Sequence, residues 1–320
     1  MRKCKICQNA EGNRSHSAKE MMFGLAESFI YTECSNCGCL QIDEVPVNIA
    51  RYYPENYYSF NTKLKQKDNP AVACLKRHRA NHVFGRHNFI GSLFWNLSKH
   101  PVFYDYFQRS KIDLNSSILD VGCGEGKLLI WMKREGFSNL TGIDPYLKES
   151  IDYGNGLIIH KMEIDELEQE YDFIMLHHSF EHMKDPVDVL QKLSRMIKKD
   201  HYILIRIPVA QSYAWKEFGT NWIALDAPRH LFLHTPASMR ILAAGAGLIM
   251  DQVVYDSGAQ QFWGSIQYQK GITFMEDRSF YVNPANSIFT SEEIEKFEKQ
   301  AKVLNENQQG DTACFYLRKK

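Results

Sequence analysis

The 320-residue sequence lacks several features that would place it in a specialised class of proteins. It has no net charge, because 38 Lys and Arg residues balance 38 Asp and Glu residues, and this argues against bulk electrostatic capture of nucleic acid. No stretch reaches the roughly 20 uncharged apolar residues that a membrane span needs, and the N-terminus has no apolar signal-peptide core. No internal repeat is present. We therefore expect a cytoplasmic protein without membrane insertion.

The composition favours an enzyme-sized globular chain. Hydrophobic residues make up 44% of the sequence, so the chain can bury a full core, with one main domain and a smaller attachment. The charge is unevenly distributed: between Lys63 and Lys111 the only acids are Asp68 and Asp105, against ten Lys and Arg residues. This stretch is either an anion-facing surface or a solvated helical face balanced by acids elsewhere.

A glycine loop follows an apolar strand at residues 118–121. Gly122, Gly124 and Gly126 occupy alternate positions, and a helix begins near the last of them. Glycines at this spacing let the backbone approach a ligand closely, and the helix start directs free N–H groups toward it. Asp120 lies two residues before the first glycine, where an acid suits a cationic ligand. The spacing therefore differs from the G-x-G-x-x-G pattern of dinucleotide folds.

A second strand over residues 139–144 ends at Asp144, about 20 residues past the glycines, where a carboxylate can accept both hydroxyls of a ribose. Together, Asp120, the three glycines and Asp144 resemble the first two motifs of the class I S-adenosylmethionine-dependent methyltransferases. The resemblance implies that these residues bind the methyl donor, and we expect Glu163 and His177 to contact it too. The alternatives are an NAD site or a glycine turn that binds nothing.

The remaining strands and helices alternate as a doubly wound sheet requires. Asp185-Pro186 and Thr235-Pro236 each supply an N-cap followed by proline at the first helical position. Further strands are expected at residues 156–160, 171–177, 202–207, 249–255 and 312–317. This pattern resembles the class I methyltransferase fold, which implies an α/β, Rossmann-like, seven-stranded and mostly parallel sheet with an antiparallel last strand. Residues 258–308 give no clear pattern.

Three units are expected along the chain: a zinc ribbon over residues 1–45, an aromatic linker and helical lid over 46–112, and an S-adenosylmethionine-binding methyltransferase domain over 113–320. The linker is rich in tyrosine, and a helical segment follows over residues 71–108. Because it precedes the first core strand, this segment is placed to cover the mouth of the pocket and exclude water. Ordinary packing of an N-terminal helical layer is the alternative.

Four of the eight cysteines form two C-x-x-C pairs, Cys4 with Cys7 and Cys34 with Cys37. Two such pairs can supply four thiolates to one tetrahedral ion, and zinc is the natural ion for them in a reducing compartment. We therefore predict a structural zinc site. Disulfides or a redox C-x-x-C explain the doubled spacing less well. Cys39 follows the second pair as a spare residue.

The segment after the fourth strand, His177-His178-Ser179-Phe180-Glu181-His182-Met183, is the candidate catalytic region. Ligands of open α/β sheets bind at this edge, and a histidine can remove the proton of a hydroxyl acceptor. His182 is the predicted base, with Glu181 orienting it or replacing it. The alternative is that the pair only fixes the turn. A metal site built from the three histidines is disfavoured, because they have no helical i, i+4 spacing.

The block at residues 222–231, with sequence WIALDAPRHL, resembles a signature of methyltransferases that act on sugars and glycans. Trp222 offers an apolar face for a sugar ring and Arg229 a fork for phosphate or carboxylate, although both residue types also brace loops. Tyr57, Tyr58 and His230 complete the expected acceptor contacts. The sugar C-methyltransferases of this group usually have a second α/β domain after the catalytic one. Because this chain ends soon after the catalytic domain, we expect O-methylation of a sugar or glycan hydroxyl and not C-methylation.

Other functions remain open alternatives. A zinc ribbon ahead of a methyltransferase domain also occurs among ribosomal RNA enzymes, and the basic stretch can track phosphates. Enzymes that methylate base amines, however, typically resemble Asn/Asp-Pro-Pro-aromatic where this chain has residues 177–180. Methylation of carbon or nitrogen on a nucleotide-linked deoxysugar is a further alternative. A binding protein without catalysis is the least favoured, because the donor motifs are intact.

Overall fold

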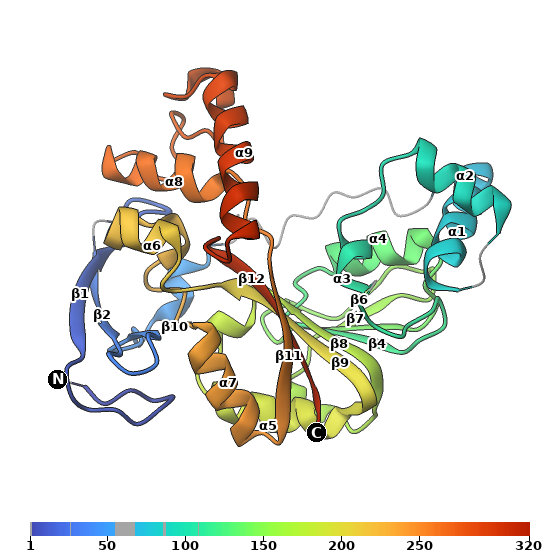
Figure 1. Cartoon of the computed structure of the whole chain (residues 1–320), viewed down its shortest axis with the longest axis horizontal. Helices are drawn as coiled ribbons and strands as arrows, with labels where there is room; N and C mark the ends of the chain where they lie inside the picture. The colour runs from blue at the N-terminus through green and yellow to red at the C-terminus, as the bar shows by residue number, and fades with distance from the viewer. Residues whose placement is uncertain (1, 26, 55–67, 86–87, 108) are drawn as a thin grey trace.

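The computed structural model describes residues 2–25, 27–54, 68–85, 88–107 and 109–320, and the described residues form two β-sheets with helices around them (Figure 1). The strands of the large sheet are β4 (Ile118–Val121), β5 (Leu140–Ile143), β6 (Ile151–Asp152), β7 (Ile158–His160), β8 (Tyr171–His177), β9 (Ile197–Pro208), β11 (Leu248–Tyr255) and β12 (Thr312–Lys319). The helices are α1 (Pro70–Phe84), α2 (Phe89–Leu97), α3 (Phe103–Phe107), α4 (Lys127–Glu135), α5 (Pro186–Met196), α6 (Tyr213–Phe218), α7 (Pro236–Gly245), α8 (Gln260–Gln269) and α9 (Ser291–Glu306).

The large sheet has the order β11-β12-β9-β8-β4-β5-β7-β6. Pairing is parallel from β9 through β8, β4 and β5 to β7, whereas β12 runs antiparallel to both β9 and β11. This is the mostly parallel, Rossmann-like α/β architecture expected, with the antiparallel strand last in the chain. The expected count of seven strands is wrong for the described residues, which form eight, because the short β6 pairs antiparallel with β7 at the sheet edge.

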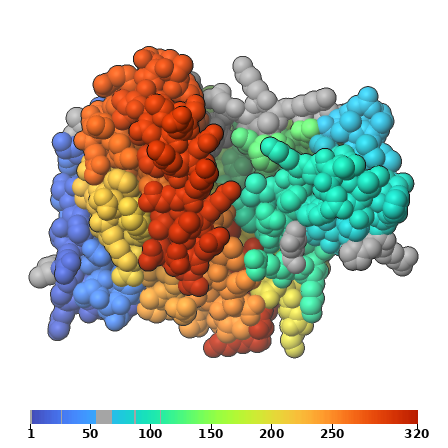
Figure 2. Space-filling view, turned by 45° about the horizontal axis from the view of Figure 1, so that its top comes forward, coloured from blue at the N-terminus to red at the C-terminus, as the bar shows by residue number. Residues whose placement is uncertain are grey.

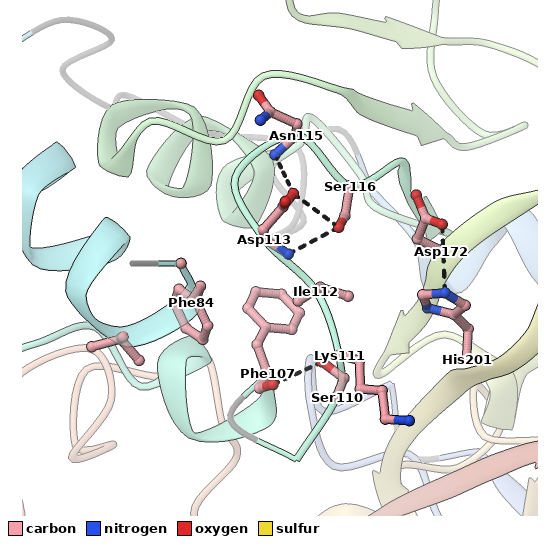
Figure 3. Close-up of a pocket in the computed structure, with 12 residues that line it drawn as sticks. Phe84, Phe107, Ser110, Lys111, Ile112, Asp113, Asn115, Ser116, Asp172 and His201 are labelled. Atoms are coloured by element: carbon pink, nitrogen blue, oxygen red, sulfur yellow. Dashed lines mark hydrogen bonds and ion pairs between the residues drawn. The ribbon is translucent and has the colours of Figure 1, made fainter. Parts of the chain in front are cut away.

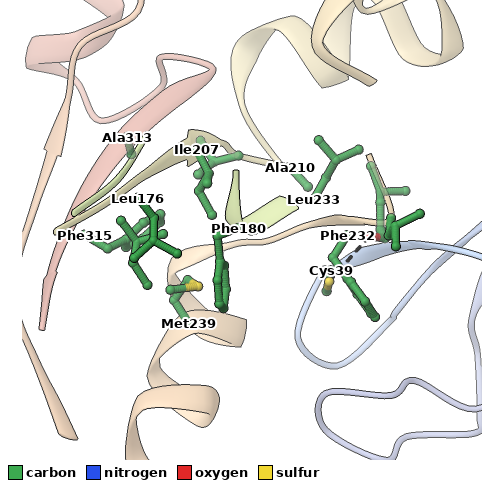
Figure 4. Close-up of a cluster of buried hydrophobic side chains, with 14 of the residues drawn as sticks. Cys39, Leu176, Phe180, Ile207, Ala210, Phe232, Leu233, Met239, Ala313 and Phe315 are labelled. Carbon is green, nitrogen blue, oxygen red and sulfur yellow. Dashed lines mark hydrogen bonds between the residues drawn. The ribbon is translucent and has the colours of Figure 1, made fainter. Parts of the chain in front are cut away.

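Both faces of the sheet are covered, which explains why its central strands are apolar on both sides. On β4, the side chain of Ile118 packs into one core and that of Leu119 into the other. On β8, the side chain of Phe173 packs into the same core as Ile118, and that of Leu176 packs into the same core as Leu119. One core extends toward the N-terminal sheet, and Figure 4 shows Phe180 among the side chains that fill it.

Local sequence signals set the helix boundaries at the donor edge. Helix α4 begins after Gly126, whose φ of 76° is in the left-handed region, and ends at Gly136. Helix α5 has Asp185 as its N-cap, with the side chain accepting from the N–H of Asp188. Helix α7 begins with a capping box between Thr235 and Ser238. The helix starts expected at Asp185-Pro186 and Thr235-Pro236 are confirmed.

The segment expected as one helical stretch over residues 71–108 forms three separate helices, α1 to α3. Helix α1 packs against α4 through a buried ion pair, in which the Arg79 guanidinium lies 2.7 Å from the Glu135 carboxylate. The Tyr104 hydroxyl of α3 donates to the same carboxylate at 2.7 Å. These contacts anchor the helices over one face of the sheet, and a role as a lid stays a prediction.

The small sheet joins the N-terminal residues to a strand from the second half of the chain. Strands β1 (Arg14–Lys19), β2 (Ser28–Glu33) and β3 (Leu40–Ile42) form a meander, and β10 (Phe232–Leu233) completes it by pairing antiparallel with β3. The sheet therefore extends beyond the unit expected over residues 1–45. The three boundaries given by sequence stay predictions.

Residues 258–308, which show no clear sequence pattern, contain helices α8 and α9. Helix α9 starts with a capping box in which the Thr290 side chain accepts from the N–H of Glu293. Figure 1 shows α9 rising from the sheet on the side opposite α5 and α7, and Figure 2 shows a hollow in the surface between α9 and the α2–α3 segment. Among the described residues, no helix is long and apolar enough to cross a membrane.

Candidate active site

The glycine loop after β4 has a conformation that other residues adopt only with strain. Gly122, Gly124 and Gly126 have φ values of 71°, 55° and 76°, all in the left-handed region. A Cβ on Gly122 would lie 2.5 Å from the Cβ of Ser179, at the end of the neighbouring strand β8. The glycines therefore permit the turn and the close approach of the two strand ends.

Two carboxylates lie beside this loop. Asp144, at the end of β5, accepts hydrogen bonds from the backbone N–H of Gly124 at 2.8 Å and of Tyr146 at 2.9 Å. Asp120 is 3% exposed, and its Oδ1 atom has no hydrogen-bond partner. Burial, with Asp144 nearby, raises the pKa of Asp120 to about 8. An unpartnered buried acid beside a glycine turn fits a ligand that brings a positive charge or a donor group.

These residues fit the donor expected from sequence. The methyl donor has a sulfonium and an ammonium, which suit Asp120, and a ribose, whose hydroxyls suit Asp144. Asp144 retains acceptor capacity beside its two backbone bonds, because a carboxylate has about four lone-pair positions. The structure thus brings together Asp120, Asp144 and the three glycines, as the spacing predicts.

A cluster of three side chains lies beyond the end of β8. Glu181 and His182 belong to a 3-10 turn, η4 (Phe180–His182), and His230 arrives from the loop before β10. One ligand-type atom from each of the three lies within 4.8 Å of the others. The rings of His182 and His230 are 4.8 Å apart, and the backbone N–H of Leu231 donates to the Glu181 carbonyl at 2.8 Å. We call Glu181, His182 and His230 the carboxylate-histidine cluster.

Electrostatics within this cluster keep Glu181 ionised and His230 neutral near neutral pH. Burial opposes ionisation of Glu181, but the surrounding histidines His178, His182 and His230 outweigh it and lower its pKa to about 2. Burial, with His182 nearby, lowers the pKa of His230 to about 4. His182 is the less buried of the two cluster histidines, and its Nδ1 contacts the Arg229 carbonyl at 2.9 Å and the Tyr53 hydroxyl at 3.2 Å.

The other residues expected at the donor lie at the same sheet edge. The partly buried His177 packs its ring 5.0 Å from that of Tyr106, and its Nε2 atom has no partner. Burial lowers its pKa well below the usual range. Glu163 is exposed, and its backbone N–H donates to the Glu166 carboxylate at 2.7 Å in the turn after β7. Their contacts with the donor stay predictions.

Trp222 and Arg229, expected to face the acceptor, lie in the interior. Each is 1% exposed. The Trp222 indole donates to Asp311 at 2.8 Å, and the Arg229 guanidinium contacts Asp226 at 2.6 Å and Glu20 at 3.0 Å. Both side chains therefore have the bracing role that sequence left as the alternative, since a buried side chain cannot offer its face to a sugar.

The remaining acceptor candidates divide into two groups. His230 belongs to the carboxylate-histidine cluster, whereas Tyr57 and Tyr58 lie outside the described residues. Sequence analysis missed Tyr53, whose hydroxyl reaches His182, and nothing in the local pattern distinguishes it from the tyrosines around it.

Cys4, Cys7, Cys34 and Cys37 come together as the doubled spacing predicts. The four sulfur atoms lie within 4.8 Å of one another, with Cys4 and Cys37 3.7 Å apart and Cys7 and Cys34 3.4 Å apart. Sulfurs bound to one tetrahedral zinc at about 2.3 Å would be separated by roughly 3.8 Å. The arrangement therefore fits one ion. Cys39 is not one of the four, and its Sγ lies 3.9 Å from Nδ1 of His234.

A surface pocket of about 620 Å³ lies away from this chemistry (Figure 3). It is lined by Phe84, Phe107, Asp113, Asp172 and His201, among others. Asp172 and the loop at Asp113 precede the buried parts of β8 and β4, so the pocket lies near the amino ends of these strands. Ligands in open α/β sheets bind at the carboxyl ends of the strands, where the glycine loop lies.

Several known methyltransferases are similar to this chain. A family model described as a methyltransferase domain matches residues 102–253. A ubiquinone biosynthesis O-methyltransferase from Nitrosomonas europaea is 29% identical over 43% of this chain and 66% of its own length. An EEF1A lysine methyltransferase 2 from Danio rerio is 28% identical over 41% of this chain and 52% of its own length. The chain thus spans between about half and two thirds of these two relatives.

Solved structures align more loosely. An S-adenosylmethionine-dependent methyltransferase from Archaeoglobus fulgidus is 20% identical, with a TM-score of 0.38 over 64% of this chain and 86% of the other. A cyclopropane synthase from Mycobacterium tuberculosis is 14% identical, with a TM-score of 0.39 over 64% of this chain and 78% of the other. Alignments this loose support no conclusion about function.

The family match, the strand order and the donor loop define the class of protein. Residues 102–253 form a methyltransferase domain, and the glycine loop with its two acids lies within it. The chain has a Rossmann-like α/β fold, and its match to the methyltransferase domain supports an S-adenosylmethionine-dependent methyltransferase.

Proposed function

We propose that the protein methylates a hydroxyl group of a sugar or glycan, such as a nucleotide sugar or a precursor of a surface polysaccharide. The observation that supports hydroxyl chemistry most directly is the carboxylate-histidine cluster at the donor edge of the sheet. A hydroxyl is a weak nucleophile until its proton is removed, and a histidine with a free ring nitrogen can remove it.

His182 has the tautomer that this role needs. Its Nδ1 lies 2.9 Å from the Arg229 main-chain carbonyl, which can only accept, so Nδ1 holds the proton and Nε2 has the lone pair. In the proposed reaction the acceptor oxygen bonds to the methyl carbon while the carbon–sulfur bond breaks, and S-adenosylhomocysteine leaves. The hydroxyl proton passes to Nε2 of His182, and the buried Glu181 carboxylate stabilises the imidazolium.

The sugar part of the proposal depends on the resemblance of residues 222–231 and not on contacts, since Trp222 and Arg229 are buried. The relatives named above act on different acceptors, as their names state: one belongs to ubiquinone biosynthesis and the other modifies a lysine. RNA methylation is the second candidate. Against it are the balanced charge and the absence of an amine-methylating pattern at residues 177–180.

We further propose that Cys4, Cys7, Cys34 and Cys37 hold one structural zinc ion. Support comes from the sulfur separations, since all four sulfur atoms lie within 4.8 Å of one another. A closed four-thiolate site leaves no open coordination position, so the ion would stabilise the N-terminal lobe and would not take part in chemistry.

The acceptor is tested by mass spectrometry of products formed from isotopically labelled donor. The panel contains nucleotide sugars, free glycans, a catechol and RNA fragments, with His182→Ala as the matched control. We expect the labelled methyl group to be incorporated into a sugar. NMR of the product should show that this methyl group is bound to oxygen. Methylation of RNA or of the catechol, with no sugar modified, would overturn the proposal.

A further inference from the structure

Glu181 is a buried carboxylate without hydrogen bonds. Its side chain is 0% exposed, and neither carboxylate oxygen has a hydrogen-bond partner among the described residues. Ring nitrogens of His178 and His230 lie 3.5 Å and 3.8 Å from the Glu181 carboxylate, both beyond good hydrogen-bonding distance. A buried charge in this state is costly unless something else compensates it.

Main-chain carbonyls set the tautomers of both cluster histidines. Nδ1 of His230 donates to the Ala224 carbonyl at 2.7 Å, and Nδ1 of His182 donates to the Arg229 carbonyl. In the neutral rings both Nε2 atoms are therefore acceptors. Fixing the outer nitrogen on a main-chain carbonyl is the usual way in which proteins orient histidines toward a metal.

We propose that Glu181, His182 and His230 bind a divalent transition-metal ion, zinc in the first instance, as a site separate from the four cysteines. Two imidazoles and one carboxylate are an established ligand set for zinc, with bond lengths near 2 Å. The three ligand-type atoms lie within 4.8 Å of one another, so closing on an ion requires each to move inward by under about 1 Å.

Binding of this metal ion is expected to block the proton-accepting role of His182. This step rests on the proposed function, in which Nε2 of His182 receives the acceptor proton. A ring nitrogen bound to zinc has no lone pair for a proton, so occupancy of the cluster is expected to inhibit methyl transfer. The site would make the enzyme sensitive to free transition metal, while the donor loop, built from other residues, keeps its affinity.

Binding is tested by equilibrium dialysis against zinc, with bound metal measured by elemental analysis. We expect two zinc ions per wild-type chain, of which the four cysteines hold one. Glu181→Gln and His230→Gln should each weaken binding of the second ion, the one in the carboxylate-histidine cluster, at least tenfold. His178→Gln is the matched control: His178 approaches Glu181 but is half exposed, contacts Arg206 and is not in the cluster, so this variant should keep both ions.

Circular dichroism and S-adenosylhomocysteine binding establish that each variant is folded. A folded wild-type protein without the second ion, or a second ion that survives in both Glu181→Gln and His230→Gln, would overturn the metal site. Inhibition is measured as turnover against free zinc, with recovery on adding a chelator. Zinc that occupies the cluster without slowing turnover contradicts the base assigned to His182 and leaves the metal site standing, so the two proposals fail separately.

Discussion

The Nδ1 atom of His182 donates to the main-chain carbonyl of Arg229, 2.9 Å away, and this contact determines which ring nitrogen is free. The Arg229 side chain is itself held by Glu20, whose carboxylate accepts at 3.0 Å and also receives backbone N–H groups at Met22 and Phe23. The N-terminal lobe thus holds the loop that orients the candidate base. The Tyr31 hydroxyl adds a second link by donating to the His230 carbonyl at 2.8 Å.

Asp144 is expected to contribute to donor affinity. Asp144→Ala should weaken S-adenosylhomocysteine binding at least tenfold, about 1.4 kcal/mol, because it removes the ribose acceptor and the bond from Gly124 that shapes the loop. Isothermal titration calorimetry measures the change. Asp152→Ala is the control, since Asp152 is an exposed carboxylate at the end of β6. Unchanged affinity in Asp144→Ala would remove this residue from the donor site.

Asp120 should make the ligand-free protein less stable as pH rises. Burial raises its pKa to about 8 in the folded state, against an ordinary value of 3.8. Between these values the unfolded chain releases a proton that the folded protein keeps, so the free energy of unfolding falls from about pH 4 to pH 8 and then levels off.

The neutral variant Asp120→Asn tests this pH dependence. It removes the ionisation, so relative to wild type it should gain more stability at pH 8 than at pH 5, while its donor affinity falls. Urea unfolding midpoints at the two pH values, measured without donor, check the difference. An equal shift at both pH values would show that Asp120 does not titrate as described.

Local patterns predicted much of the fold. The strand expected at residues 171–177 is β8, and the prolines after Asp185 and Thr235 mark the starts of α5 and α7. The glycine spacing likewise predicted a tight loop between β4 and α4. A local signal at Thr290 and Glu293 also marked the start of α9, within the stretch that sequence left undefined.

Contacts between distant residues could not be predicted. Arg229 pairs with Asp226 three residues away, but it also pairs with Glu20, 209 residues away, and this second ion pair has no signature near residue 229. His230 joins Glu181 only because the loop before β10 returns to η4, where Leu231 bonds the Glu181 carbonyl. Periodicity and capping are local properties and do not report such pairings.

Removing the zinc ligand Cys34 should unfold the N-terminal lobe. Binding to four-cysteine sites can contribute on the order of 10 kcal/mol, so Cys34→Ser should lose the metal and the order of the small sheet. Cys74→Ser is the matched control, because Cys74 is exposed on α1 and far from the cluster in sequence. Elemental analysis and hydrogen exchange over β1 to β3 report the two effects. Zinc retained in Cys34→Ser would exclude this residue as a ligand.

His182 should affect turnover and not donor binding. If its Nε2 removes the acceptor proton, His182→Ala lowers kcat by roughly 10²- to 10⁴-fold, because the lost interaction belongs to the transition state. Donor affinity by calorimetry should stay near wild type, since the glycine loop and Asp144 are untouched. The pH–rate profile should also lose the limb that reports this base. His178→Ala is the control, because it removes a neighbouring imidazole that is half exposed and lies outside the cluster.

The pair Glu181 and His182 can be separated by comparing variants. Glu181→Gln keeps the shape of the side chain and removes the charge that would stabilise the imidazolium, so we expect a smaller loss than in His182→Ala. If Glu181→Gln abolishes turnover while His182→Ala stays near normal, the carboxylate is the base and the histidine only positions it. If both variants are active but have lower urea unfolding midpoints, the hydrogen bond from His182 to the Arg229 carbonyl contributes to stability alone. In that case another group must remove the acceptor proton.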